Sequence, residues 1–327
     1  MDYKNKTWQQ ELAEGFSNIH ELCKYLNISP NKANVLTSPD FPLRVPIEFV
    51  ERMEKGNLND PLLKQIFPVH DENEYFPGFN NDPVGDINAM AETGVIHKYH
   101  DRVLFITTGS CAINCRYCFR RNFPYSDFQL STEKQTQAID YIKNNKEITE
   151  VILSGGDPLI LSDKKLFTLI QQLEQIKHIK RIRIHSRIPI ILPSRITTEF
   201  CDMLATLNIP IVLVVHSNHA NELNSNVKTA CEKIQHSNVT LLNQSVLLKG
   251  INDHAQQLCA LSEKLFDFGI LPYYLHLLDK ANGTGHFEVE QKTAIALMDQ
   301  VKKHLPGYLV PKLVREQAGA DNKIIIT

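Results

Sequence analysis

Three cysteines stand close together at a regular spacing. They are Cys111, Cys115 and Cys118, a C-x3-C-x2-C run in which Tyr117 precedes the last cysteine. Three thiolates on one short loop can hold three irons of a cubane iron–sulfur cluster, and the fourth iron then has no protein ligand. An open coordination position is where a bound metal acts on another molecule. The spacing therefore predicts a [4Fe–4S] cluster with one open iron.

A zinc site is the competing interpretation of these cysteines. No second C-x2-C pair and no H-x3-H pair follows them to complete four ligands, which disfavours zinc. An odd count of seven cysteines without a disulfide framework fits a reducing, cytoplasmic compartment. The remaining cysteines stand in helical patterns and are interpreted as small buried apolar residues, namely Cys23, Cys201, Cys231 and Cys259.

Composition excludes several classes of protein. Apolar residues make up 43% of the chain, but no apolar stretch approaches the length of a membrane span, which needs about 20 residues. The opening residues, from Met1 to Lys6, lead into an amphipathic segment and not into a signal-peptide core. A net charge of −2 gives no reason to expect a nucleic-acid partner. We therefore expect no membrane and no nucleic acid.

The region 1–95 is predicted to be helical and irregular. An apolar stripe at helical spacing predicts one amphipathic helix that ends between Asn27 and Pro30, and Pro46 begins a short helix. Residues 68–95 are rich in Asn, Asp, Gly and Pro, which indicates a long connection wrapping another domain. The stripe consists of Trp8, Leu12, Phe16, Ile19, Cys23 and Leu26.

From about residue 100 strands and helices alternate. Strands are predicted at 102–107, 150–154, 181–185, 211–215, 240–244 and 271–275. Helices are predicted at 131–146, 163–177, 196–207, 222–235 and 255–268. Thr132 with Gln135 could form a capping box, and Ser162 or Asp163 could cap the next helix. Six such repeats predict an α/β protein with a parallel sheet, an incomplete (β/α)6 barrel over 96–287. Residues 288–327 would add a C-terminal helix and a short extension.

Polar residues follow every predicted strand. In a parallel barrel these segments open on one face, where barrel enzymes place their sites. The strap Ser154-Gly155-Gly156-Asp157 lets backbone approach a ligand, and Asp157 can accept from an ammonium or hydroxyl group. Arg120 lies two residues past a cluster ligand, where it could clamp a carboxylate. A phosphate could be held by a further basic and amide group, namely Lys98, His100, Arg102, Asn243 and Gln244.

Several of these motifs, in this order, carry a resemblance to a known family. They are the stretches 104–121, 154–159, 242–248 and 272–274, and the match runs from about residue 40 to the end. Together they resemble the lysine 2,3-aminomutase family, whose members are radical S-adenosylmethionine (SAM) enzymes. The stretches 43–46, 97–100, 118–125, 183–187 and 308–313 resemble the bacterial branch that makes (R)-β-lysine for elongation factor P.

The resemblance implies three cofactors and their ligands. The cluster would lie on the three cysteines and SAM on its open iron, beside Ser154, Gly155, Gly156, Asp157, Ser186 and His216. Pyridoxal phosphate (PLP) would be bound by the catalytic Lys323, with Lys98 and Arg102 at its phosphate and Asn243 and Gln244 near its ring. Arg120 would take the substrate carboxylate, and Asp279 with Glu316 the distal ammonium.

The chain departs from the family pattern at three places. Lys98 stands where free-lysine mutases usually have arginine, which loses a bidentate fork. Glu316 replaces an aspartate. The segment from Gly319 to Ile325 replaces a glycine-rich run followed by Lys-Thr-Pro. Extra C-terminal cysteines of the zinc-binding members are absent from the sequence, so we expect no zinc.

The implied activity is that of an isomerase, a 1,2-amino shift that converts free L-lysine to β-lysine, and specifically the (R) product for elongation factor P. It implies a one-electron reductant of the flavodoxin or ferredoxin type, and we expect a homo-oligomer. Two alternatives remain open. One is a radical SAM enzyme that works without PLP, on another substrate or on a protein side chain. The other is an electron-transfer iron–sulfur protein that leaves SAM uncleaved.

Overall fold

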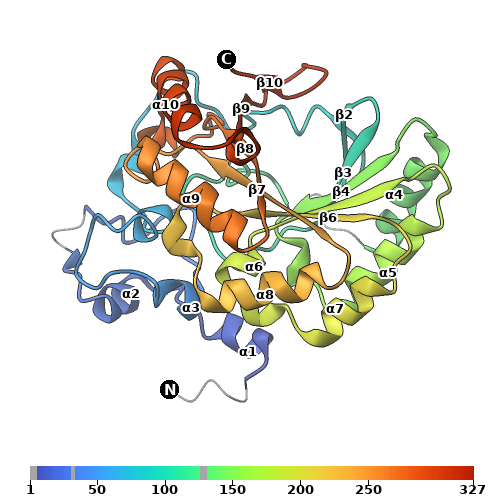
Figure 1. The fold of residues 1–327 in the computed structure, drawn as a ribbon, viewed down its shortest axis with the longest axis horizontal. Coiled ribbons are helices and arrows are strands. Elements are labelled where there is room, and N and C mark those ends of the chain that lie inside the picture. The colour runs from blue at the N-terminus through green and yellow to red at the C-terminus, as the bar shows by residue number, and fades with distance from the viewer. Residues whose placement is uncertain (1–5, 31–33, 126–130) are drawn as a thin grey trace.

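One mixed sheet organises the protein. The computed structural model describes residues 6–30, 34–125 and 131–327, so the opening segment before Lys6 lies outside it. The described residues form a ten-stranded sheet in the order of the sequence, parallel from β3 to β9 and antiparallel at both sides (Figure 1). The strands are β1 (Met90–Glu92), β2 (Val95–Tyr99), β3 (Arg102–Thr108), β4 (Glu150–Gly155), β5 (Arg181–Ser186), β6 (Ile211–His216), β7 (Thr240–Val246), β8 (Leu271–His276), β9 (Lys312–Arg315) and β10 (Ile324–Ile325).

The six predicted strands are confirmed as β3 to β8. Each begins where predicted and ends one or two residues later, because apolar residues mark each strand, in a continuous run in β4 and β6 and in alternation in β5. The flanking strands β1, β2, β9 and β10 were not predicted, since they are short. In the described chain β1 and β10 do not pair with each other, so the barrel is incomplete, as expected.

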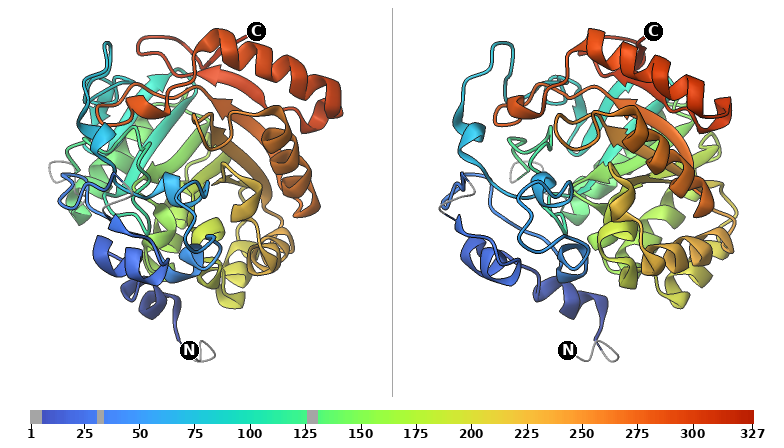
Figure 2. Two further views of the ribbon diagram at one scale, coloured as in Figure 1. Left: turned by 90° about the vertical axis from the view of Figure 1, so that its left-hand side faces the viewer. Right: turned by 60° about the vertical axis from the view of Figure 1, so that its left-hand side comes forward.

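Helices cover the outer side of the curved sheet (Figures 1 and 2). They are α4 (Thr132–Asn144), α5 (Asp163–Glu174), α6 (Ile188–Ile191), α7 (Thr198–Ala205), α8 (Ser225–Gln235), α9 (Ala255–Asp267) and α10 (Gln291–His304). The predicted capping box at Thr132 is wrong, because the N-cap is Ser131, whose hydroxyl accepts from Lys134 N at 3.2 Å. Ser162 occupies the N-cap position of α5 without a side-chain hydrogen bond. Short 3-10 helices are η3 (Leu63–Gln65), η4 (His70–Asn73), η5 (Pro158–Ile160), η6 (Pro193–Arg195), η7 (Ala220–Glu222), η8 (Gly285–Phe287) and η9 (Gly307–Leu309).

The predicted single N-terminal helix is wrong. The chain forms α1 (Trp8–Ala13) and α2 (Ile19–Tyr25), followed by α3 (Ile47–Val50) after Pro46. The break comes from a long-range pairing that local periodicity does not reveal. Phe16 and Val45 exchange backbone hydrogen bonds of 2.8 and 3.0 Å, and a Cβ on Gly15 would lie 2.7 Å from Val45 O.

The N-terminal segment, which comprises the described residues before β1, packs on the loop that follows β3. Backbone bonds join Asn114 N to Arg44 O at 2.9 Å and Arg116 N to Gln65 O at 2.8 Å. Arg116 is fully buried and pairs with Glu72 of η4, which also binds Arg121. Apolar residues of the segment share one hydrophobic core with the barrel (Figure 2, blue), so the segment is an integral layer. No helix in the described ranges has the length and apolar character needed to cross a bilayer.

Candidate active site

A cavity of about 640 Å³ extends along the parallel strands, from the first residues of β3, β4 and β5 to the C-terminal ends. Strands β2 to β8, the loop after β3 and the C-terminal segment all contribute to its wall. Nearly all of the predicted site residues line it, although they are spread over more than two hundred positions. They are Lys98, Arg102, Cys111, Cys115, Cys118, Arg120, Ser154, Gly155, Gly156, Asp157, Ser186, His216, Gln244, Asp279, Glu316 and Lys323.

The three cysteines lie on the loop that follows β3. Burial raises the pKa of the Cys111 thiol, and Cys118, Asp157 and Cys115 add to the rise. Burial likewise raises the pKa of Cys118 to about 11, with Cys115 as the next cause. Thiolates placed together in this wall would repel one another, so the three cysteines are a donor set that a cationic centre would stabilise. In the described chain no three such ligands converge closely enough for a single ion, whereas each thiolate of a cubane binds a different iron.

The glycine strap after β4 packs on this cysteine loop. A Cβ on Gly156 would lie 2.2 Å from Ser110 O, and one on Gly155, whose φ is +109°, would lie 2.7 Å from Thr108 O. Backbone bonds of 2.7 and 2.9 Å run from Gly156 N to Thr108 O and from Asp157 N to Ser110 O. The glycines were expected to admit a ligand. Their missing side chains admit the protein's own backbone, which fixes the strap against the cysteines.

The side chains of Asp157 and Ser186 are hydrogen-bonded to each other. The Asp157 carboxylate accepts from Ser186 Oγ at 2.7 Å, from Leu159 N at 3.0 Å, and from Arg187 N and Ile188 N at 2.8 and 3.2 Å. Each oxygen thus already accepts two donors. The carboxylate ties the end of β4 to the end of β5 and is 5% exposed.

A second polar group joins β2, the cysteine loop and the connection before β1. The Asp86 carboxylate accepts from Lys98 Nζ at 2.6 Å and from Arg120 Nε at 2.7 Å. Burial alone would lower the pKa of Arg120, but the charge of Asp86 outweighs it and the net shift is upward. Arg120 Nη1 lies 3.5 Å from Ser154 Oγ. Because Asp86 accepts from the Nε–H of Arg120, neither Nη group is needed to bind this carboxylate.

The C-terminal segment brings Lys323 and Glu316 into the wall of the cavity. Glu316 forms ion pairs with Lys323 and with Lys98 (3.4 Å to Lys98 Nζ), and it accepts from Tyr99 OH at 2.9 Å. Burial raises the pKa of Asp279 to about 7, with Lys323 opposing the rise and Glu316 adding to it. Lys98 therefore pairs with two carboxylates of the cavity wall, Asp86 and Glu316.

Two histidines of the wall have buried nitrogen atoms without a hydrogen-bond partner. These are His185 Nε2 at the end of β5 and His276 Nε2 at the end of β8. Burial lowers the pKa of both rings well below the usual range, so both are neutral. A buried polar atom without a partner is costly. The wall is therefore complementary to polar groups of a bound molecule, as the three implied cofactors require.

Two predicted site residues do not line the cavity. His100 is exposed and pairs with Glu147 at 3.1 Å, and the other residue is Asn243. Its amide is 2% exposed and binds Ser217 and Ser245, with Ser217 N donating to Oδ1 at 2.9 Å. Its neighbour Gln244 points to the other face of β7, as alternation along a strand requires. Sequence reasoning assigned no role to Asp86, His185, His276 or Arg187. The histidines and Arg187 follow strands, which was a usable signal, whereas Asp86 stands in a stretch without periodicity.

Comparisons with known proteins agree with this geometry. The chain matches the Radical SAM superfamily model over residues 105–261. It is 46% identical over 319 residues to an L-lysine 2,3-aminomutase of Escherichia coli (strain K12), covering 97% of this chain and 93% of that protein. The one from Clostridium subterminale is 34% identical over 319 residues, with 97% and 76% covered. A radical SAM methyltransferase structure from Sphaerobacter thermophilus aligns over 68% of each chain at a TM-score of 0.48 and 14% identity, a likeness too weak to carry an argument. With nearly the whole length matched, the chain belongs to the L-lysine 2,3-aminomutase family of radical SAM enzymes.

Proposed function

We propose that this cavity moves the α-amino group of L-lysine to its β-carbon, and that the product is (R)-β-lysine used to modify elongation factor P. The observation that carries the proposal is one cavity with three cysteines, a buried arginine and two acidic side chains beside a lysine. The family supplies the reaction class, an isomerisation. The product enantiomer and its destination rest on the branch resemblance alone, since both relatives carry the same name, L-lysine 2,3-aminomutase.

The cavity wall supplies residues for each cofactor of this reaction. Cys111, Cys115 and Cys118 would hold the [4Fe–4S] cluster, whose open iron takes SAM. Lys323 would hold the aldehyde of PLP, and Lys98 and Arg102 its phosphate. When bound, these groups supply a carbon radical and stabilise the nitrogen during its migration.

The protein's own part is to fix both ends of the substrate. Arg120 would bind the carboxylate of lysine through its Nη groups, of which Nη1 also lies 3.5 Å from Ser154 Oγ, while Asp86 orients the guanidinium through Nε. Asp279 and Glu316 lie beside Lys323 and would receive the distal ammonium. Holding a molecule at both ends limits which carbon–hydrogen bond a radical can reach. Burial of these groups excludes water, which would otherwise weaken each ion pair.

The proposal extends to partners and compartment. Reduction of the cluster needs one electron, which a flavodoxin- or ferredoxin-type protein would deliver. The rings of exposed Phe266 and Tyr308 pack at a tilt of 54° with their centroids 5.5 Å apart, and an exposed apolar group supports a homo-oligomer contact. The cysteines of the described chain are free thiols, which supports a cytoplasmic location.

Anaerobic reconstitution with iron, sulfide and PLP tests the proposal. The protein is then incubated with SAM, dithionite and a panel of amino acids, and the products are separated on a chiral column. We expect conversion of L-lysine to (R)-β-lysine, and its loss in Lys323→Ala but not in Lys312→Ala, a more exposed lysine of the same wall. Cleavage of SAM without conversion of any amino acid, in protein that binds no PLP, would favour the PLP-independent alternative.

A further inference from the structure

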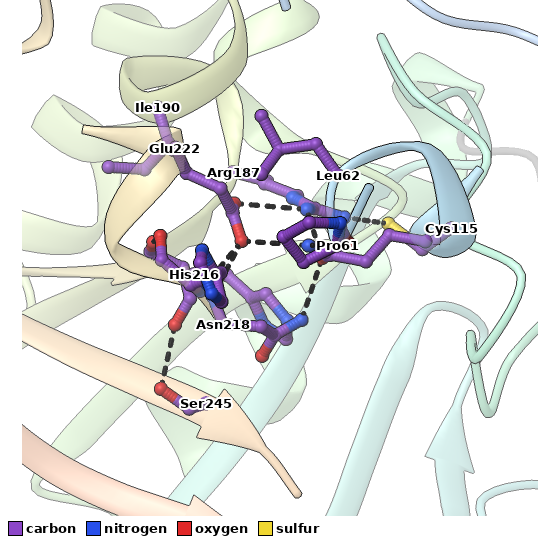
Figure 3. A network of polar contacts seen from close by, with 12 residues as sticks. Pro61, Leu62, Cys115, Arg187, Ile190, His216, Asn218, Glu222 and Ser245 are labelled. Atoms are coloured by element: carbon purple, nitrogen blue, oxygen red, sulfur yellow. Dashed lines mark hydrogen bonds and ion pairs between the residues drawn. The ribbon is translucent and has the colours of Figure 1, made fainter. Parts of the chain in front are cut away.

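Arg187 follows β5 and lies behind the cysteine loop, outside every role assigned above. Its side chain is 6% exposed and its guanidinium donates to four acceptors. Nη1 donates to Cys115 Sγ and to Tyr117 OH, both at 2.7 Å. Nη2 donates to Gln65 Oε1 at 2.7 Å and to Glu222 Oε2 at 3.1 Å. Figure 3 shows the guanidinium between the Cys115 sulfur and the Glu222 carboxylate.

The acceptors of Arg187 are themselves held by the protein. Glu222 is fully buried at the end of η7 and accepts from Asn218 N at 2.8 Å, His219 N at 3.0 Å and Gln65 Nε2 at 3.0 Å. Gln65 belongs to the N-terminal segment and also accepts from Asn218 Nδ2 at 3.0 Å. This network leaves the guanidinium one position, with one edge on the cysteine sulfur.

A donor on a cluster thiolate has an electronic consequence. Reduction adds one electron to the cluster, and part of that negative charge resides on the sulfur ligands. An N–H donor and a positive charge at the sulfur stabilise the reduced state more than the oxidised state, which raises the reduction potential. Glu222 acts in the opposite direction, because its carboxylate compensates the charge of Arg187.

We infer that Arg187 and Glu222 are positioning residues that together set the reduction potential of the cluster through Cys115. The inference rests on the proposed function, since it requires a cluster on the three cysteines. Arg187 makes the cluster easier to reduce by donating to the ligand sulfur. Glu222 holds the donor in place and limits how far the potential rises.

Two substitutions separate this role from a merely structural one, because they act with opposite signs. Arg187→Met removes the donors and the charge while keeping an unbranched side chain. Glu222→Gln keeps the shape of the carboxylate and leaves the charge of Arg187 uncompensated. The control is Arg195→Met, because Arg195 is equally buried and binds Leu159 O and Asp163 in place of a cluster cysteine.

The measurement is a redox titration of the reconstituted cluster, followed by electron paramagnetic resonance without lysine. We expect Arg187→Met to lower the equilibrium constant for reduction at least tenfold, about 59 mV for a one-electron couple. Glu222→Gln should raise the potential, Arg187→Lys should lie between Arg187→Met and wild type, and Arg195→Met should leave it unchanged.

Potentials that stay within a few millivolts of wild type in both variants, or that shift in the same direction, would overturn the inference. If Arg187→Met does not fold, the sign of the shift in Glu222→Gln and the position of Arg187→Lys decide it. A wild type that takes up no cluster would overturn the proposed function as well. A wild type with a cluster but no lysine turnover would overturn only the proposed reaction, because the potential is measured without substrate.

Discussion

Replacing Asp279 by asparagine should raise the free energy of unfolding of the apoprotein and weaken the binding of lysine by the enzyme. The pKa of Asp279 is raised from 3.8 to about 7, mainly by burial. Between these values the folded protein binds a proton that the unfolded chain does not, so stability falls as the pH rises. One pKa unit corresponds to about 1.36 kcal/mol, so an ionised Asp279 costs the folded state about 4 kcal/mol at high pH. Asparagine has the same shape and does not carry this cost.

Urea unfolding of the apoprotein as a function of pH measures the effect. The free energy of unfolding of Asp279→Asn, relative to wild type, should grow by about 2.5 kcal/mol between about pH 5 and about pH 8. Asp321→Asn, which changes an exposed aspartate near Lys323, should follow the wild-type profile. In reconstituted enzyme the KM for lysine should rise about 10- to 100-fold in Asp279→Asn, because an ionic hydrogen bond to the distal ammonium is lost.

The Asp279→Asn variant should be more stable and yet bind lysine more weakly, so a general loss of structure cannot explain the weaker binding. Parallel pH profiles of wild type and Asp279→Asn would refute the reasoning about the buried charge. An unchanged KM for lysine would refute the assignment of Asp279 to the distal ammonium.

Three further outcomes follow from the geometry. Gly156→Ala should disrupt the strap and weaken SAM binding, because its Cβ would lie 2.2 Å from a backbone oxygen. Gly307→Ala should be tolerated, because its Cβ would meet nothing within 4 Å. Calorimetry compares the affinity of the two variants for SAM. Glu72→Gln removes the carboxylate shared by two buried arginines and should cost about 3–5 kcal/mol in urea unfolding. The arginines outweigh burial and lower the pKa of Glu72, so this stability is present above its ordinary pKa and is lost as the pH falls through the depressed value. Asp86→Asn leaves Arg120 without this counter-ion and leaves Lys98 paired with Glu316, so inorganic phosphate should raise the thermal unfolding temperature of this variant more than that of wild type at equal ionic strength.

The sequence predicted the central strands and most of the cavity wall for one physical reason. The central strands carry continuous or alternating apolar residues, and the polar residues at their C-terminal ends must share one face. These two regularities were enough to predict that residues as far apart in the sequence as Cys111 and Lys323 line one cavity. It could not predict the flanking strands, because β10 has only two residues and β9 four.

Contacts between distant segments account for what the sequence did not predict. The break after α1 depends on Val45, which pairs with Phe16 from across a loop. Arg187 was visible as a strand-end arginine, but its partner Gln65 is 122 positions away. Asp157 looked available for a ligand, and only the structure shows that Ser186 and three backbone N–H groups already occupy its oxygens.

Glu316 explains how an altered C-terminal loop can still present Lys323. The sheet is open, and on one side of the opening β2 carries Lys98 and Tyr99, both of which bind Glu316. Glu316 directly follows β9 and pairs with Lys323, so one carboxylate joins β2 to the C-terminal loop. The residues between them include exposed Ala318 and Gly319, which add little apolar packing. The position of Lys323 therefore depends on this carboxylate and on the pairing of β10 with β9, and the longer arm of glutamate reaches β2 and Lys323 together.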